Sequence, residues 1–184
     1  MSQQTGKVVY VGVVRSNDFV AVASYAHVDV INTDGVRLLV RSQEKLEPRK
    51  LYVSKTDELA VNFYADDRGR VYLVVTLQDY PARVAYLLLE ELQSRFLTKA
   101  GEKISTATED SLSRSCRGIF KEICERYNKL SEVDQIASVQ EQLNTVTTTM
   151  QDNIKNMLQN EQKLQDILQQ SGALGFSPFT DMYA

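Results

Sequence analysis

The chain has 184 residues, of which 43% are apolar and 24% carry a charge, and its formal net charge is −3. These values are typical of a soluble globular protein with one ordinary domain and an extension. The small negative charge excludes a general attraction to nucleic acid or to an anionic membrane, and no apolar run is long enough to span a bilayer.

The first half of the chain predicts a hairpin, one helix and a second pair of strands. Runs of β-branched and aromatic residues favour the strands, and polar turns separate them. The turn at 66–69 reads Asp-Asp-Arg-Gly, in which Asp and Gly tolerate the backbone angles of a tight turn. The predicted elements are strands over 8–14 and 19–25, a helix that starts at Thr33 and ends by Pro48, and strands over 51–65 and 70–77.

Two helices follow, and both carry apolar residues at helical spacing. Asp79 suits the capping position of the first helix, Pro81 is tolerated in its first turn, and Gly101 is expected to close it. The second helix is predicted over 108–130. The order strand-strand-helix-strand-strand-helix-helix indicates an α/β sandwich ahead of the last third of the chain.

The last third carries a heptad repeat. Alternating steps of three and four residues from Ile136 reach twelve positions up to Leu174, and nine of them are apolar. A period of 3.5 residues is typical of a coiled-coil seam, and one helix with such a seam needs partner helices or a groove on its own protein. The seam positions are Ile136, Val139, Leu143, Val146, Met150, Asn153, Met157, Asn160, Leu164 and Ile167, with Ser171 and Leu174 beyond the expected end. Gly172, Gly175 and Pro178 predict the end of the helix and a disordered tail.

The sequence offers no recognisable catalytic or metal site. His27 is the only histidine, and neither a nucleophile-acid arrangement nor a Gly-rich phosphate loop is visible. Cys116 and Cys124 stand eight residues apart in a predicted helix, which does not suit a bridge, so we expect reduced thiols in an intracellular protein. Asp66 and Asp67 are interpreted as a hairpin tip and not as paired carboxylates. We therefore predict a binding protein without cofactor or metal, and not an enzyme.

Two parts of the chain resemble known motifs. Segment 79–90 reads DYPARVAYLLLE and is similar to the signature of longin domains, an aromatic–proline pair (Tyr80, Pro81) followed by Arg-x-Ala (Arg83, Ala85) and Leu-rich residues. The heptad segment resembles the R-SNARE motif in the same register, through VQxQL, MxxNI and LxxxxKL. The chain as a whole resembles a longin-type SNARE, and most of all the lipid-anchored longin SNARE that lacks a transmembrane helix.

This resemblance implies a fold, a division into domains and a function. The fold is a profilin-like α-β-α sandwich around a five-stranded, mostly antiparallel sheet, followed by a SNARE coiled-coil helix. The implied parts are a longin-like regulatory domain over 1–130, a SNARE motif over 131–174 and a disordered tail over 175–184. The implied partners are Q-SNARE helices in a hetero four-helix bundle, and also the chain's own longin domain. The implied setting is vesicle trafficking and membrane fusion at the cytoplasmic face of the Golgi, endosomes or vesicles, or in the cytosol.

The chain departs from this family pattern in two ways. The R-SNARE motif has an arginine in the central polar layer, whereas the register here places Asn160 there. An amide can hydrogen-bond to partner glutamines but brings no charge. The family also carries a transmembrane helix or lipidated cysteines at its end. For this sequence we expect either an anchor that lies outside it or membrane association through partners.

Three functions remain open at this point. The chain can be a fusogenic SNARE, a longin-like adaptor or tether whose heptad forms an ordinary dimer, or an inhibitory SNARE that enters a bundle without driving fusion. Asn153 and Asn160 favour a hetero-bundle over a homodimer, because single amides at a seam select partners at some loss of stability.

Overall fold

The computed structural model describes residues 7–43, 46–137, 145–150, 152–158, 166 and 168–169. The strands in these ranges are β1 (Val8–Arg15), β2 (Val20–Ala26), β3 (Leu51–Lys55), β4 (Leu59–Ala65), β5 (Arg70–Leu77) and β6 (Thr145–Thr149). The helices are α1 (Thr33–Arg41), α2 (Ala82–Ala100), the 3-10 turn η1 (Gly101–Lys103), α3 (Ser113–Tyr127), α4 (Leu130–Ala137) and α5 (Asp152–Leu158). The sheet has the order β2-β1-β5-β4-β3-β6, and its neighbours are antiparallel except for β3 and β6.

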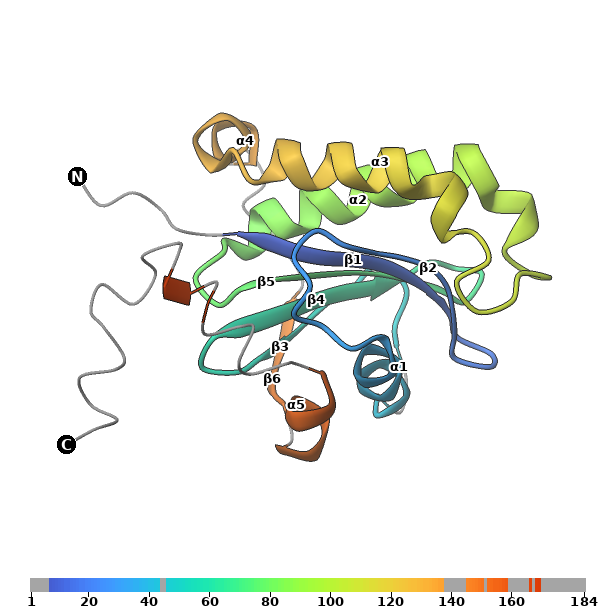
Figure 1. Ribbon diagram of the computed structural model, residues 1–184, viewed down its shortest axis with the longest axis horizontal. Coiled ribbons are helices and arrows are strands. Elements are labelled where there is room, and N and C mark those ends of the chain that lie inside the picture. The colour runs from blue at the N-terminus through green and yellow to red at the C-terminus, as the bar shows by residue number, and fades with distance from the viewer. Residues whose placement is uncertain are drawn as a thin grey trace.

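Two layers of helix cover the sheet. α2 and α3 lie over one face, and α1 and α5 lie over the other (Figure 1). Each face has its own hydrophobic core, because successive side chains of a strand point to opposite sides. In β4, for example, Tyr64 belongs to the core under α2 and α3, whereas Val61 and Phe63 belong to the core under α1. The structure therefore confirms the α-β-α sandwich.

The two turns predicted in the first half of the chain are present. β1 and β2 form the hairpin expected over 8–14 and 19–25. The turn at 66–69 joins β4 to β5, and Gly69 adopts a φ of 73°, which a side chain would strain. Asp66 accepts hydrogen bonds from the backbone N–H of Arg68 (2.9 Å) and belongs to this hairpin tip, as predicted.

The single strand predicted over 51–65 is wrong, because the chain turns back at Thr56. The Thr56 side-chain oxygen accepts hydrogen bonds from the backbone N–H groups of Glu58 (3.2 Å) and Leu59 (2.9 Å). A hydroxyl that bonds its own backbone two or three residues on is a turn device. The stretch is therefore the hairpin β3–β4, which gives the longin-like part its fifth strand.

The predicted helices are present with adjusted ends. α1 begins at Thr33 as expected, but it ends at Arg41, well before Pro48. Asp79 does not cap α2; Pro81 occupies the capping position with extended backbone angles and no side-chain cap. The helix predicted over 108–130 is shorter, since α3 covers Ser113–Tyr127.

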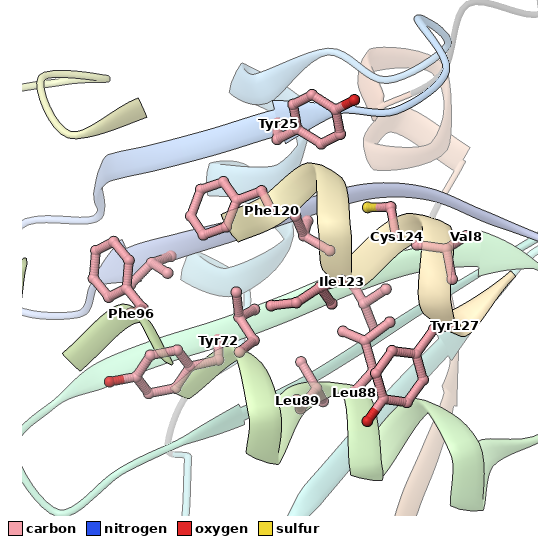
Figure 2. Packing of buried hydrophobic residues seen from close by; sticks show 14 of the residues in the cluster. Val8, Tyr25, Tyr72, Leu88, Leu89, Phe96, Phe120, Ile123, Cys124 and Tyr127 are labelled. Carbon is pink, nitrogen blue, oxygen red and sulfur yellow. The ribbon is translucent and has the colours of Figure 1, made fainter. Parts of the chain in front are cut away.

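Figure 2 shows the core between the sheet and the pair α2 and α3. Phe96 of α2 stacks on Phe120 of α3 with their ring centroids 6.0 Å apart, and Tyr72 of β5 is fully buried in the same core. The hydroxyl of Tyr80 donates a hydrogen bond of 2.7 Å to the backbone carbonyl of Tyr127. Tyr80 thereby ties the start of α2 to the end of α3, which gives the aromatic residue of the signature a structural role.

Candidate functional site

The heptad segment does not form one long helix over the residues that the structure describes. α4, β6 and α5 follow one another along it, so the predicted uninterrupted helix is wrong for the chain on its own. Alone, such a helix would expose its apolar seam to water. Residues 145–149 also read Thr-Val-Thr-Thr-Thr, and β-branched side chains favour a strand over a helix.

β6 extends the sheet at the edge strand β3. The two strands are parallel, with a register that runs from Leu51 opposite Thr145 to Lys55 opposite Thr149 (Figure 1). Just after the strand, the backbone N–H of Met150 donates to the carbonyl of Lys55 over 3.3 Å. The segment thus occupies the hydrogen-bonding edge of the five-stranded sheet.

α5 packs beside α1 on the face opposite to α2 and α3 (Figure 1). Ile154 and Leu158 are 3% and 0% exposed, and both join the core that contains Val36 and Leu39 of α1. Met150, which precedes the helix, is buried in the same core. The heptad segment is therefore held by an apolar contact on one sheet face as well as by the strand pairing.

The C-terminal end of α5 meets the N-terminal end of α1. The backbone N–H of Asn32 donates to the carbonyl of Leu158 over 2.6 Å, while the Asn32 side chain caps α1 by accepting from the N–H of Asp34 over 2.9 Å. The last carbonyls of a helix lack partners within it, and a helix N-terminus carries partial positive charge, so this contact is favourable. Gly35 leaves the room for it, because a Cβ there would lie 2.6 Å from the Leu158 nitrogen.

The described seam positions lie in different elements of this structure. Ile136 lies in α4, Val146 in β6, and Asn153 and Met157 in α5. Met150 is buried, whereas the Met157 side chain is 47% exposed. The remaining seam positions, Val139, Leu143, Asn160, Leu164 and Ile167, fall outside the described residues. The assignment of Asn160 to a central polar layer therefore stays a prediction.

Sequence reasoning missed the residues that dock the segment. Ile154, Leu158 and Leu168 are all buried in the core under α1, and none of them is a seam position. The available signal was their apolar character at positions where a coiled coil needs none. The predicted signature residues Tyr80 and Ala85 are buried in the other core, whereas Ile154 and Leu158 belong to the core under α1.

The titratable groups of the described residues form no reactive site. Burial raises the pKa of the Cys124 thiol to about 12 and also raises the pKa of Cys116, so both stay protonated at neutral pH. Burial lowers the pKa of His27, whose Nδ1 lies 3.4 Å from the Tyr25 hydroxyl. Within the described ranges, no three His, Cys, Asp or Glu residues are placed to hold a metal ion, and no helix is both long and apolar enough to cross a membrane.

Comparison with known proteins matches both halves of this arrangement. The longin family model, described as a regulated-SNARE-like domain, matches residues 36–118, and the synaptobrevin family model matches residues 135–178. The chain is 30% identical over 114 residues to the synaptobrevin homolog YKT6 of Candida glabrata, which covers 60% of this chain and 54% of the relative. It is 24% identical over 133 residues to the protein of that name from Yarrowia lipolytica, covering 72% and 66%. The chain belongs to the longin-type SNARE family.

The two matches place the longin domain and the SNARE motif on the structure. The longin match begins in α1 and ends in α3, and the synaptobrevin match contains β6 and α5, so the docked segment belongs to the SNARE motif. A third relative, YKT6 of Saccharomyces cerevisiae, is 28% identical over 60% of this chain and 56% of its own length. This longin SNARE thus spans about half to two thirds of the length of these relatives.

Proposed function

We propose that this chain is a SNARE of intracellular vesicle trafficking and membrane fusion. Its longin domain binds the SNARE motif until partner helices bind the motif instead. The observation that supports this most is the docking of β6 and α5 on the longin domain. The partners are Q-SNARE helices, which complete a four-helix bundle along the seam with Asn160 in its central layer. The site of action is the cytoplasmic face of endomembranes such as the Golgi, endosomes or vesicles.

The docked and bundled states exclude each other. Residues 145–149 form a strand on β3 in the docked state, and the same residues must be helical to carry seam position Val146 in a bundle. A partner shifts such an equilibrium only by the difference in its affinity for the two states. Q-SNARE helices bind the helical form alone, so their concentration and affinity control the opening of the chain.

Two buried side chains contribute to the docking contact. Full burial of a Leu or Ile side chain contributes about 1.5–3 kcal/mol, and Ile154 and Leu158 are both almost fully buried.

The test is assembly of the full chain with candidate Q-SNARE helices, followed by circular dichroism. Mixing should raise the helical signal above the sum of the separate components, because the strand and the short helix become one long helix. Leu164→Asp should abolish this gain, since it places an unpaired charge in a desolvated layer. Gln169→Asp, at an exposed position off the seam, is the matched control and should assemble normally. Equal assembly of the two variants would contradict the seam register and the bundle.

The tether alternative differs in the oligomeric state of the free chain. With its segment docked on its own domain, the chain should scatter light as a monomer of 20.8 kDa at micromolar concentration. A stable dimer through the heptad would favour the adaptor or tether instead. The inhibitory alternative would appear as normal bundle assembly without membrane fusion by the full-length protein.

A further inference from the structure

The SNARE motif contains apolar residues that the coiled-coil seam does not use. Between Ile136 and Leu174, the large apolar residues off the seam are Ile154, Leu158 and Leu168. Each one directly follows a seam position. Around an ideal helix the three span roughly 80°, in a stripe beside the seam. Pairing with partner helices along the seam does not call for apolar residues there.

The docked state buries this second stripe. Ile154, Leu158 and Leu168 are 3%, 0% and 3% exposed, and all three belong to the core under α1. By contrast, the neighbouring seam residue Met157 is 47% exposed. Met150 is a seam residue that the docked state does bury, but it lies in the link between β6 and α5. Along α5, the longin domain therefore contacts the second stripe and leaves Met157 accessible.

Gly35 of α1 lies against the α5 backbone at Leu158. A Cβ at residue 35 would lie 2.6 Å from the Leu158 nitrogen and 2.7 Å from the Met157 carbonyl carbon. Both are backbone atoms, so no change of side chain on α5 can relieve the clash. Glycine is a poorer helix former than alanine, and α1 does not need a left-handed residue here, because Gly69 is the glycine with positive φ among the described residues. The close approach of α5 is the physical reason for a glycine at this position.

We infer that the SNARE motif carries two separate apolar faces. The seam pairs with partner helices, and a second face of Ile154, Leu158 and Leu168 binds the longin domain. Gly35 of α1 leaves the room that the α5 backbone needs in this contact. This inference rests on the proposed function. Because the faces are separate, docking buries the second face and leaves the seam residue Met157 47% exposed. Docking and bundle stability can then be changed independently by substitutions at adjacent residues.

The test compares adjacent and matched variants of the full chain in two measurements. The first is amide hydrogen exchange of residues 145–158 in the free chain, which reports docking. The second is the thermal stability of the bundle with Q-SNARE helices. Leu158→Ser should raise the exchange of the segment by roughly thirtyfold or more, the effect of truncating a fully buried leucine, and should leave the bundle unchanged. Met157→Ser should leave docking unchanged and lower the melting temperature of the bundle.

Two glycine-to-alanine variants test the role of Gly35 in docking. Gly35→Ala should raise exchange of residues 145–158 as strongly as Leu158→Ser does, with no change in the bundle. Gly118→Ala is the matched control, because a Cβ at this exposed helical glycine meets nothing within 4 Å, and both measurements should stay as in the parent chain. Loss of amide protection in β4 and β5 would show that a glycine variant has unfolded. In that case the comparison of Met157→Ser with Leu158→Ser tests the inference.

The outcomes separate failure of the inference from failure of the proposed function. If Leu158→Ser and Met157→Ser weaken the bundle equally, or if Gly35→Ala keeps full protection of the segment, the two-face inference is overturned while the SNARE assignment stands. If the parent chain forms no bundle with any Q-SNARE set, the proposed function fails, and the inference falls with it.

Discussion

Replacing Thr148 with proline should release the SNARE motif from the longin domain, whereas replacing its neighbour Thr147 should not. The N–H of Met150 bonds to the Lys55 carbonyl of β3, and N–H groups alternate sides along a strand. The N–H of residue 148 therefore faces β3, and that of residue 147 faces solvent. Proline has no N–H, so only the change at 148 removes a hydrogen bond between the two strands.

The expected size of this effect follows from the strand pairing. Loss of one strand hydrogen bond costs about 1 kcal/mol, and a β3 carbonyl left without its partner adds about 1–2 kcal/mol. Together these terms of about 2–3 kcal/mol shift the ratio of docked to released segment by about 30- to 140-fold. At Thr147, which is exposed, no such bond is lost, and proline on the solvent side of an edge strand should change the ratio by less than about fivefold.

Amide hydrogen exchange within β3 measures the release directly. The N–H of Thr56 bonds across to the carbonyl of Leu59 over 2.8 Å, on the β4 side. By alternation, the N–H of Ser54 also faces β4, whereas those of Val53 and Lys55 face β6. In the Thr148→Pro variant, Val53 and Lys55 should exchange faster while Ser54 stays protected. Unchanged exchange at Val53 and Lys55, or equal acceleration by both proline variants, would refute the docking role of β6.

Three further predictions follow from single residues. Tyr80→Phe should lower the free energy of unfolding by about 1–2 kcal/mol in a thermal melt, because it removes the hydrogen bond to the Tyr127 carbonyl in a buried core; an unchanged melting temperature would contradict this role. Asn160→Arg should preserve or strengthen assembly with Q-SNARE helices, since a guanidinium can be met by several amide oxygens, and weaker assembly would argue against the central layer. Cys124 should resist thiol reagents at pH 8 until the protein unfolds, because burial raises its pKa to about 12. The contribution of this thiol to the free energy of unfolding is present below the ordinary thiol pKa and is lost as the pH rises toward 12. Rapid labelling of the native protein would contradict this burial.

Most of the sandwich could be predicted because its signals are local. The β-rich runs of β1 and β2, the Asp-Asp-Arg-Gly turn and the helical spacing of α2 each fix an element without knowledge of the rest of the chain. The hairpin at Thr56 was missed because its turn depends on a hydroxyl that bonds its own backbone, with no Gly or Pro to mark it.

The state of the SNARE motif could not be predicted from its period. The heptad favours the helix that the proposed function requires in a bundle, while the β-branched run at 145–149 favours the strand that the segment forms on β3. The two patterns favour different structures for the same residues, and the heptad does not describe the docked one. The apolar residues Ile154 and Leu158, which lie off the seam, indicate the docked state. This signal can be interpreted only once α1 is known to pack against them.

The position of β6 at the rim of the sheet also bears on the solubility of the released form. When β6 leaves, the backbone N–H and C=O groups of Val53 and Lys55 on β3 lose their partners, and a bare strand edge is a template for pairing with another chain. β3 is only five residues long, and exposed Lys55 ends it, features that discourage such pairing but leave the hydrogen-bonding groups in place. An opened chain that finds no partner helices is therefore expected either to reclose or to aggregate edge to edge, which makes prompt capture by partners a condition for keeping the protein in solution.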